Sequence, residues 1–213
     1  MTTIGILGAG RVGTNLARAL ALAGHDVVVG RRDTSSPAGT AVQEAGVRVT
    51  GQRDAAAGAD IVIHATPGDT AVERLSALEK ELAGKILIDV ANATQDGPDG
   101  LPGDLLYPGG SLAERLQAVL PATRVVKTLN TMLFTVMTAP GTLSTPPTVY
   151  LSGNDPEAKT TVSRILADLG WRQEWIEDLG DVTTARATEA TVLLVPHVLR
   201  RHGFQPFAVS LAR

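Results

Sequence analysis

The sequence lacks cysteine and has few aromatic side chains. Without cysteine among its 213 residues, the chain forms neither disulfides nor thiolate metal sites, and it has no thiol nucleophile. Aromatic residues make up only 3%, too few to suggest stacking platforms for single-stranded nucleic acid. The formal net charge of −3 also lacks the basic excess typical of nucleic-acid binding. These absences exclude thiol chemistry and argue against a nucleic-acid partner.

Long apolar runs are missing as well. No stretch reaches the roughly 18 apolar residues that a membrane helix needs. The sequence begins Met1-Thr2-Thr3, without the basic and then apolar segment of a secretion signal. We therefore expect no membrane partner and a cytoplasmic location. The hydrophobic fraction of 44% is ordinary for a globular protein, and the length allows one large and one small lobe.

Strand and helix patterns alternate along the first ninety residues. Four short apolar runs predict buried strands, at residues 4–7, 26–29, 61–63 and 86–90. Amphipathic segments between them predict helices, so the pattern indicates an α/β fold with a doubly wound parallel Rossmann sheet. We expect an NADP-binding Rossmann domain over residues 1–130. A small C-terminal α/β lobe over residues 131–213 is expected to complete the substrate cleft.

The remaining segments give weaker patterns. Eight of the fourteen residues from Gly97 to Gly110 are glycine or proline, which predicts an irregular loop. Apolar spacing predicts one helix over residues 69–82 and a strand over residues 171–176. A long apolar helix is predicted over residues 183–202, with a kink at Pro196.

A glycine-rich motif lies between the first predicted strand and the first predicted helix. The run Gly8-Ala9-Gly10-Arg11-Val12-Gly13 fits the GxGxxG pattern in its required strand–helix context. Gly8 makes the tight turn, Gly10 lets the backbone approach a pyrophosphate, and Gly13 lets the helix pack close to the sheet. The free amides at the helix start, together with its dipole, favour a diphosphate there. The motif therefore predicts a dinucleotide site, with a turn that binds nothing as the alternative.

The end of the second predicted strand indicates which dinucleotide binds. Arg31 and Arg32 directly follow this strand, and guanidinium groups offer paired donors to phosphate oxygens. NADP enzymes use such groups for the 2′-phosphate, whereas NAD enzymes place a carboxylate there for the ribose. Asp33 is the alternative ribose acid, but it lies three residues late. The pattern favours NADP, although the two arginines are also compatible with solvated surface charges.

Small uncharged residues follow the other predicted parallel strands. The carboxyl ends of such strands line one crevice, and small residues leave room there for a flat nicotinamide. We expect five of them to contact the cofactor: Thr66, Pro67, Gly68, Asn92 and Ala93. Ordinary strand-end turns are the alternative interpretation.

No acid–base pair emerges from the sequence. The histidines lack metal-ligand spacing, so no metal site is expected, and His64 is interpreted as structural. Asp89 would titrate abnormally if it were buried. Lys127 fits either an acid near the nicotinamide or a strand surface position, and Glu189 fits a cleft-facing position less well than other orientations. The catalytic residues stay unknown, which suits hydride transfer between aligned cofactors.

The sequence resembles the NADPH-dependent reductases of the deazaflavin coenzyme F420. Six segments carry the resemblance, which covers essentially the whole chain: residues 4–13, 24–32, 88–92, 111–114, 126–131 and 151–155. The same signature occurs in the cytosolic domains of metalloreductases. The resemblance implies that residues 9–12 hold the diphosphate and that Arg31 and Arg32 hold the 2′-phosphate. It also implies that Asn92 and residues 66–68 line the nicotinamide ribose.

The resemblance also places the acceptor between the two lobes. Asn130 stands where well-understood members carry histidine beside the ring, and Met132-Leu133 replaces a proline-containing turn. We expect Asn130, Thr131 and Met132 to contact the substrate. Because aromatic residues are scarce, a bound deazaflavin is expected to rest mostly on backbone and small side chains.

The predicted function is hydride transfer between NADP(H) and coenzyme F420 or a related acceptor. One alternative is an NADPH-dependent imine or carbonyl reductase, for which the C-terminal part is short. A second alternative is a non-catalytic NADP-sensing protein. We expect a small-molecule substrate, and the apolar final helix suggests a homodimer.

Overall fold

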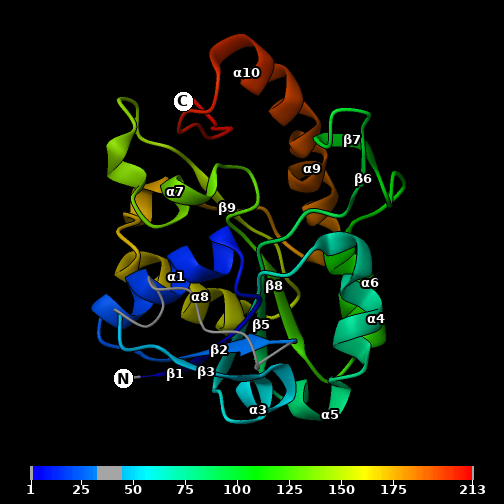
Figure 1. Ribbon diagram of the computed structural model, residues 1–213, viewed down its shortest axis with the longest axis vertical. Coiled ribbons are helices and arrows are strands. Elements are labelled where there is room, and N and C mark those ends of the chain that lie inside the picture. The colour runs from blue at the N-terminus through cyan, green and yellow to red at the C-terminus, as the bar shows by residue number, and fades with distance from the viewer. Residues whose placement is uncertain (1, 33–44, 213) are drawn as a thin grey trace.

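A six-stranded parallel sheet forms the centre of the molecule (Figure 1). The computed structural model describes residues 2–32 and 45–212. Every neighbouring pair of strands is parallel, in the order β3-β2-β1-β4-β5-β8. The strands are β1 (Thr3–Leu7), β2 (Asp26–Arg31), β3 (Arg48–Gly51), β4 (Ile61–His64), β5 (Ile86–Asp89) and β8 (Arg124–Lys127). The strand order reverses at β1 and β4, which confirms the doubly wound Rossmann sheet and puts its ligand crevice there.

Helices cover both faces of this sheet. One hydrophobic cluster includes residues of α1 (Arg11–Leu22), α7 (Phe134–Met137) and α8 (Pro156–Asp168). The cluster on the opposite face includes residues of α3 (Gln52–Ala57), α4 (Ala71–Ser76), α5 (Glu79–Leu82) and α6 (Leu112–Val119). Side chains alternate between the two faces along each strand, as the pleat requires.

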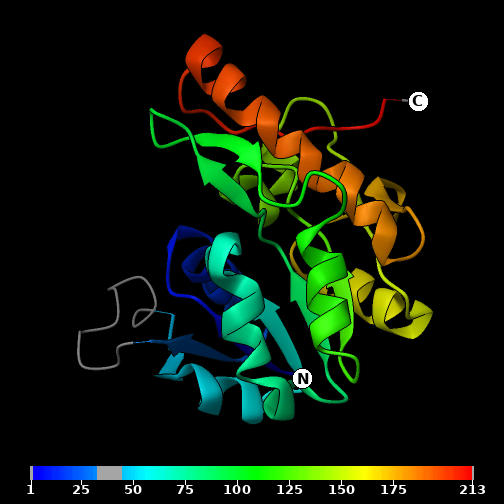
Figure 2. The same ribbon diagram turned by 90° about the vertical axis from the view of Figure 1, so that its right-hand side faces the viewer.

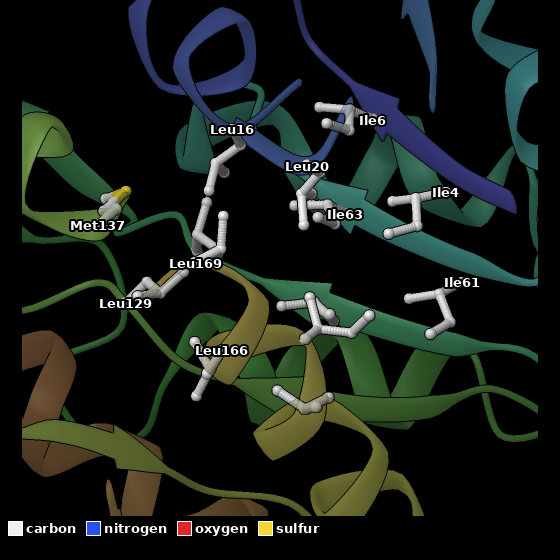
Figure 3. Packing of buried hydrophobic residues seen from close by; sticks show 14 of the residues in the cluster. Ile4, Ile6, Leu16, Leu20, Ile61, Ile63, Leu129, Met137, Leu166 and Leu169 are labelled. Carbon is white, nitrogen blue, oxygen red and sulfur yellow. The ribbon is translucent and has the colours of Figure 1, made fainter. Parts of the chain in front are cut away.

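The first cluster joins the two halves of the chain. Figure 3 shows Ile6 and Ile63 of the sheet on the same side as Leu16 of α1 and Leu166 of α8. Residues from both sides of position 130 thus share one core, and burial of this apolar surface holds α8 on the sheet. The expected division into domains 1–130 and 131–213 stays a prediction.

The smaller strand–helix–strand unit departs from its prediction. Strand β9 (Val149–Leu151) pairs in parallel with β10 (Ile176–Asp178), and α8 connects them. The strand predicted over residues 171–176 is wrong, because residues before 176 form a 3₁₀ turn, η3 (Gln173–Trp175). Trp171 is buried and donates its indole N–H to the carbonyl of Met137 at 2.9 Å. This contact ties the segment before η3 to α7.

Two other predictions are also wrong. The single helix over residues 69–82 is divided into a 3₁₀ turn, η1 (Gly68–Thr70), followed by α4 and α5. The Arg53 guanidinium donates to the carbonyl of Ala77 at 3.0 Å, at the break between the two helices. The irregular loop contains an antiparallel hairpin, β6 (Thr94–Asp96) and β7 (Pro102–Leu105). Between these strands, Gly100 adopts φ 71° and the Asp99 carboxylate accepts from the amide of Leu101, a turn that aspartate and glycine favour.

The last helical stretch lies across the carboxyl ends of the strands (Figures 1 and 2). It comprises η4 (Val182–Thr184), α9 (Ala185–Ala190), η5 (Thr191–Leu194) and α10 (Val195–His202). The 3₁₀ turn η5 directly precedes the first turn of α10, which contains Pro196, so the break falls where proline predicts it. Within the described residues, no helix has the length and apolar character of a membrane span.

Candidate dinucleotide and acceptor site

The glycines of the motif have distinct packing environments. A Cβ at Gly8 would lie 2.4 Å from the carbonyl oxygen of Ala65, and Gly8 has φ +120°. A Cβ at Gly13 would lie 1.9 Å from the carbonyl oxygen of Gly8. At Gly10, by contrast, a Cβ would meet nothing within 4 Å. Gly8 and Gly13 therefore permit the close turn and helix packing, while Gly10 leaves open surface at the start of α1.

A cavity of about 410 Å³ lies at this open surface, and we name it the arginine cavity. Its lining residues are Gly8, Ala9, Gly10, Gly30, Arg31, Arg32, Gln52, Ala65, Thr66, Pro67 and Arg74. The helix start and the guanidinium groups together suit a nucleotide diphosphate with an additional phosphate. The residues present thus fit NADP. The alternative ribose acid, Asp33, lies outside the described residues.

A second cavity, of about 310 Å³, is lined mainly by apolar side chains, and we name it the phenylalanine cavity. The chain has three phenylalanines, Phe134, Phe204 and Phe207, and all of them line it. The Arg11 guanidinium lies 5.7 Å from the ring centroid of Phe134 and 5.9 Å from that of Phe204. Three of the seven aromatic residues thus gather at one place, where mostly backbone and small side chains were expected. Such a lining suits a flat ring.

The segment after α10 forms part of this cavity by folding back onto the chain. The carbonyl of Phe207 accepts from the amide of Leu133 at 3.0 Å, and the amide of Val209 donates to the carbonyl of Thr131 at 2.9 Å. Phe134 lies 70 positions before Phe204 in the sequence, so no local periodicity joins it to the pair at positions 204 and 207. The sequence therefore carried no local signal for this cavity.

Two asparagines connect the predicted cofactor and substrate residues. Asn92 donates to the backbone carbonyl of Asn130 at 2.8 Å, and the Asn130 amide donates to Oδ1 of Asn92 at 3.0 Å. Both asparagines and Met132 line the phenylalanine cavity. Leu129 precedes Asn130 with φ 61°, a strained conformation that turns the chain after β8. The pairing of Asn92 with Asn130 supports the expectation that residues after the parallel strands line one crevice.

The other predicted residues divide between the cavities. Thr66 and Pro67 line both the arginine and the phenylalanine cavities, so the two meet there. Arg11, Val12 and Gly68 line the phenylalanine cavity. Three predicted residues line neither cavity: Gly13, which packs under the turn, Ala93, which is buried, and Thr131, whose carbonyl accepts from Val209.

Four charged or titratable side chains form a buried network beneath this site. His64, Asp89, Lys127 and Glu189 are exposed by 0%, 0%, 1% and 4%. His64 Nδ1 lies 2.8 Å from Asp89 Oδ1, and Lys127 Nζ donates to Asp89 Oδ2 at 2.7 Å. Lys127 Nζ also lies 2.8 Å from Glu189 Oε1. We name this set the buried charge network. It joins the ends of β4, β5 and β8 to α9.

Glu189 and Thr66 are at the two ends of the network. The Glu189 carboxylate accepts from the amides of Leu112 and Ala113, at 2.8 and 3.2 Å, at the start of α6. The positive end of the α6 dipole also favours this carboxylate. At the other end, His64 Nε2 lies 2.7 Å from the Thr66 hydroxyl. A chain of contacts therefore runs from α6 and α9 to the junction of the two cavities.

Charge pairing keeps the central groups ionised. Burial acts to raise the pKa of Asp89, but the Lys127 ammonium and His64 lower it to about 2. Burial acts to lower the pKa of Lys127, but the carboxylates of Asp89 and Glu189 raise it above its usual value. The sequence showed these residues only singly. Lys127 at the surface of a strand was one of two expectations, and its burial excludes that one.

The family comparison agrees with this geometry. Residues 3–93 match the family model described as NADP oxidoreductase, coenzyme F420-dependent. The chain is 37% identical to a proposed F420-dependent NADP reductase from Arthrobacter sp. FB24, whose crystal structure superposes with a TM-score of 0.91 and full coverage of both chains. The chain belongs to this family of NADP oxidoreductases.

Two relatives with assigned names are more distant. The F420-dependent NADP reductase of Methanocaldococcus jannaschii is 32% identical over 67% of this chain, and the metalloreductase STEAP3 of Rattus norvegicus is 33% identical over 89%. The chain spans 64% of the length of the former and 36% of the latter. An imine reductase from Myxococcus stipitatus, in complex with NADP+, shares the fold at 17% identity, with a TM-score of 0.68 over 94% of this chain and 63% of that one.

Proposed function

We propose that the protein transfers a hydride between NADP(H) and coenzyme F420 or a related deazaflavin. Family membership supports the use of NADP. The observation that carries the proposal is the junction of the two cavities at Thr66 and Pro67. One cavity offers guanidinium groups and an open helix start, and the adjoining one offers apolar side chains and aromatic rings. A phosphate-rich nucleotide and a flat acceptor ring therefore suit neighbouring positions.

The cofactor contacts follow from the cavity linings. Ala9, Gly10, Arg11 and Val12 would hold the diphosphate at the start of α1. Arg31 and Arg32 would hold the 2′-phosphate, and Thr66, Pro67, Gly68, Asn92 and Ala93 would lie along the nicotinamide half. Asn130, Thr131 and Met132 would contact the acceptor. Among these, Ala93 and Thr131 line neither cavity, so they would act by positioning their neighbours Asn92 and Asn130, which do.

The reaction needs little acid–base chemistry from the protein. One hydride from NADPH and one proton from solvent convert the oxidised deazaflavin to its reduced form and leave NADP+. The chain's part is to align the two rings and to exclude water between them. The apolar lining of the phenylalanine cavity serves this purpose.

A direct assay tests the proposal. Purified protein mixed with NADPH and oxidised coenzyme F420 should lose the absorbance of both compounds, in equal molar amounts. Loss of neither absorbance, with NADPH binding intact, would contradict the deazaflavin as acceptor.

The choice of dinucleotide has its own test. Arg31→Ala should lower the preference for NADPH over NADH about tenfold, the loss of one charge-assisted contact to phosphate. Arg18→Ala, an exposed substitution on α1 outside both cavities, is the matched control. An unchanged ratio of KM values in Arg31→Ala would contradict the assignment of the 2′-phosphate site.

Two alternative activities remain testable in the same experiments. The likeness in fold to NADP-bound imine reductases makes a cyclic imine a second acceptor to assay. Tight NADPH binding without oxidation by either acceptor would instead favour an NADP-sensing protein.

We also propose a cytoplasmic homodimer. Leu194 and Phe204, which lie just before and just after α10, are 49% and 64% exposed, which suits an interface between two copies of the chain. Light scattering should then give twice the monomer mass, and a monomer mass would contradict the interface.

A further inference from the structure

The Thr66 hydroxyl lies at the junction of the two cavities and contacts a buried histidine. Thr66 lines both cavities, and its Oγ1 is 2.7 Å from Nε2 of His64. The direction of this hydrogen bond decides whether the hydroxyl can donate toward the cavities. A hydroxyl has a single proton, so a proton given to His64 leaves only lone pairs for a ligand.

The buried charge network fixes that direction. Asp89 carries two strong contacts, from His64 Nδ1 at 2.8 Å and from Lys127 Nζ at 2.7 Å. The ionised carboxylate of Asp89 only accepts hydrogen bonds, so His64 Nδ1 must carry a proton. In an imidazole with a single proton, held on Nδ1, Nε2 is then an acceptor. The Thr66 hydroxyl therefore donates to His64.

The remaining groups of the network keep the Asp89 carboxylate ionised. Lys127 is held between the carboxylates of Asp89 and Glu189, and Glu189 accepts from the amides at the start of α6. The amide of Ala91 also donates to Asp89 Oδ1, at 3.1 Å. All these groups keep Asp89 an acceptor, and they thus favour the His64 tautomer with its proton on Nδ1.

We infer that His64 is a positioning residue that makes the Thr66 hydroxyl a hydrogen-bond acceptor toward the nicotinamide half of NADP(H). The inference rests on the proposed function, because it takes the ligand at Thr66 to be that half of the cofactor. An acceptor at this place selects a ligand group that donates, which is a ribose hydroxyl or the amide of the nicotinamide. His64 itself touches no ligand, because it is fully buried.

Two substitutions at position 64 separate the two ends of the imidazole. In His64→Asn, the side-chain amide can still donate to Asp89 from the place of Nδ1, but nothing reaches the place of Nε2. In His64→Gln, the longer side chain can place its oxygen near Nε2 and accept from Thr66. A structural role in the core affects both variants, whereas the positioning role distinguishes them.

The experiment is a fluorescence titration of NADPH at pH 8 with the full chain. We expect Thr66→Val and His64→Asn each to raise the Kd of NADPH about five- to tenfold, the effect of one hydrogen bond. His64→Gln should change it less than about twofold. The double variant Thr66→Val/His64→Asn should bind no more weakly than Thr66→Val alone, because both changes remove the same contact.

A second probe maps the effect onto the nucleotide. Adenosine 2′,5′-bisphosphate lacks the nicotinamide half, so its affinity should be equal in all four variants and the unmutated protein. Multiplying effects in the double variant, or equal losses in His64→Asn and His64→Gln, would overturn the inference. If the unmutated protein binds neither compound, the proposed function itself fails. If it binds both and His64→Asn leaves the Kd of NADPH unchanged, only the inference fails.

Discussion

Two groups of charged side chains lie near the carboxyl ends of the strands of the central sheet, in contrasting surroundings. Arg31, Arg32 and Arg74 line a cavity open to solvent. Asp89, Lys127 and Glu189 are almost fully buried and satisfy one another at 2.7 to 2.8 Å. The first group places positive charge where a ligand can meet it. The second group has its charges paired within the protein, one ammonium between two carboxylates.

The contrast predicts that the exposed arginines contribute to ligand binding, whereas the buried charges contribute to folding stability. Removing an exposed charge changes folding stability by less than about 0.5 kcal/mol, because water screens it. Removing one member of a buried set leaves its partners uncompensated, which costs about 3–5 kcal/mol. The loss of one charged side chain should therefore change folding stability little in the first group and strongly in the second. Variants in each group test this difference.

The largest effect is expected for Lys127→Met. Methionine keeps much of the side-chain volume but leaves two buried carboxylates, Asp89 and Glu189, without their cation. Unfolding in urea at pH 7 should show a loss of about 3–5 kcal/mol. Arg32→Met is the control from the arginine cavity and should change stability by less than about 0.5 kcal/mol. A loss below about 1 kcal/mol in Lys127→Met would remove the distinction between the two groups.

A smaller effect on folding stability is expected when the pH is lowered. The pKa of Asp89 is lowered from 3.8 to about 2 in the folded protein. As the pH falls, Asp89 of the unfolded chain takes up its proton first, so acid favours unfolding. The resulting contribution is about 2 kcal/mol above pH 5, and about half of it remains at pH 3.

Urea unfolding between pH 6 and pH 3 measures this contribution. The difference in stability between the unmutated protein and Asp89→Asn should shrink by about 1 kcal/mol over that range. A difference that stays constant would show that Asp89 does not titrate differently in the folded and unfolded states.

The strand ends and the glycine motif were predictable because their signals are local. Gly8, Gly10 and Gly13 are close in sequence. Each has one structural role at a fixed place in a strand–turn–helix unit. Apolar runs of three to five residues likewise marked the buried strands. The parallel pairing of the strands followed from the alternation with helices.

The charge network and the phenylalanine cavity were not predictable in this way. His64 and Glu189 are 125 positions apart and meet only because β4 and α9 converge on Asp89 and Lys127. Phe134 and Phe207 come together through the folded-back C-terminal segment. Periodicity reports which face of one element is buried, and it carries no information about which distant side chains meet there. The hairpin of residues 94–105 was missed for a different reason, since its glycine and aspartate turn was interpreted as irregular.

The smallest effect concerns salt. Raising NaCl from about 0.05 to 0.5 M shortens the screening length to roughly a third, which weakens the attraction of exposed arginines for a phosphate-rich ligand. The Kd of NADPH should rise about three- to tenfold, and Arg32→Met should show a smaller rise. The stability difference between Lys127→Met and the unmutated protein should stay within about 0.5 kcal/mol over the same range, because buried pairs are screened much less. If salt changes that difference as strongly as it changes the Kd, the network is reached by solvent, and the contrast between the two groups of charges does not hold.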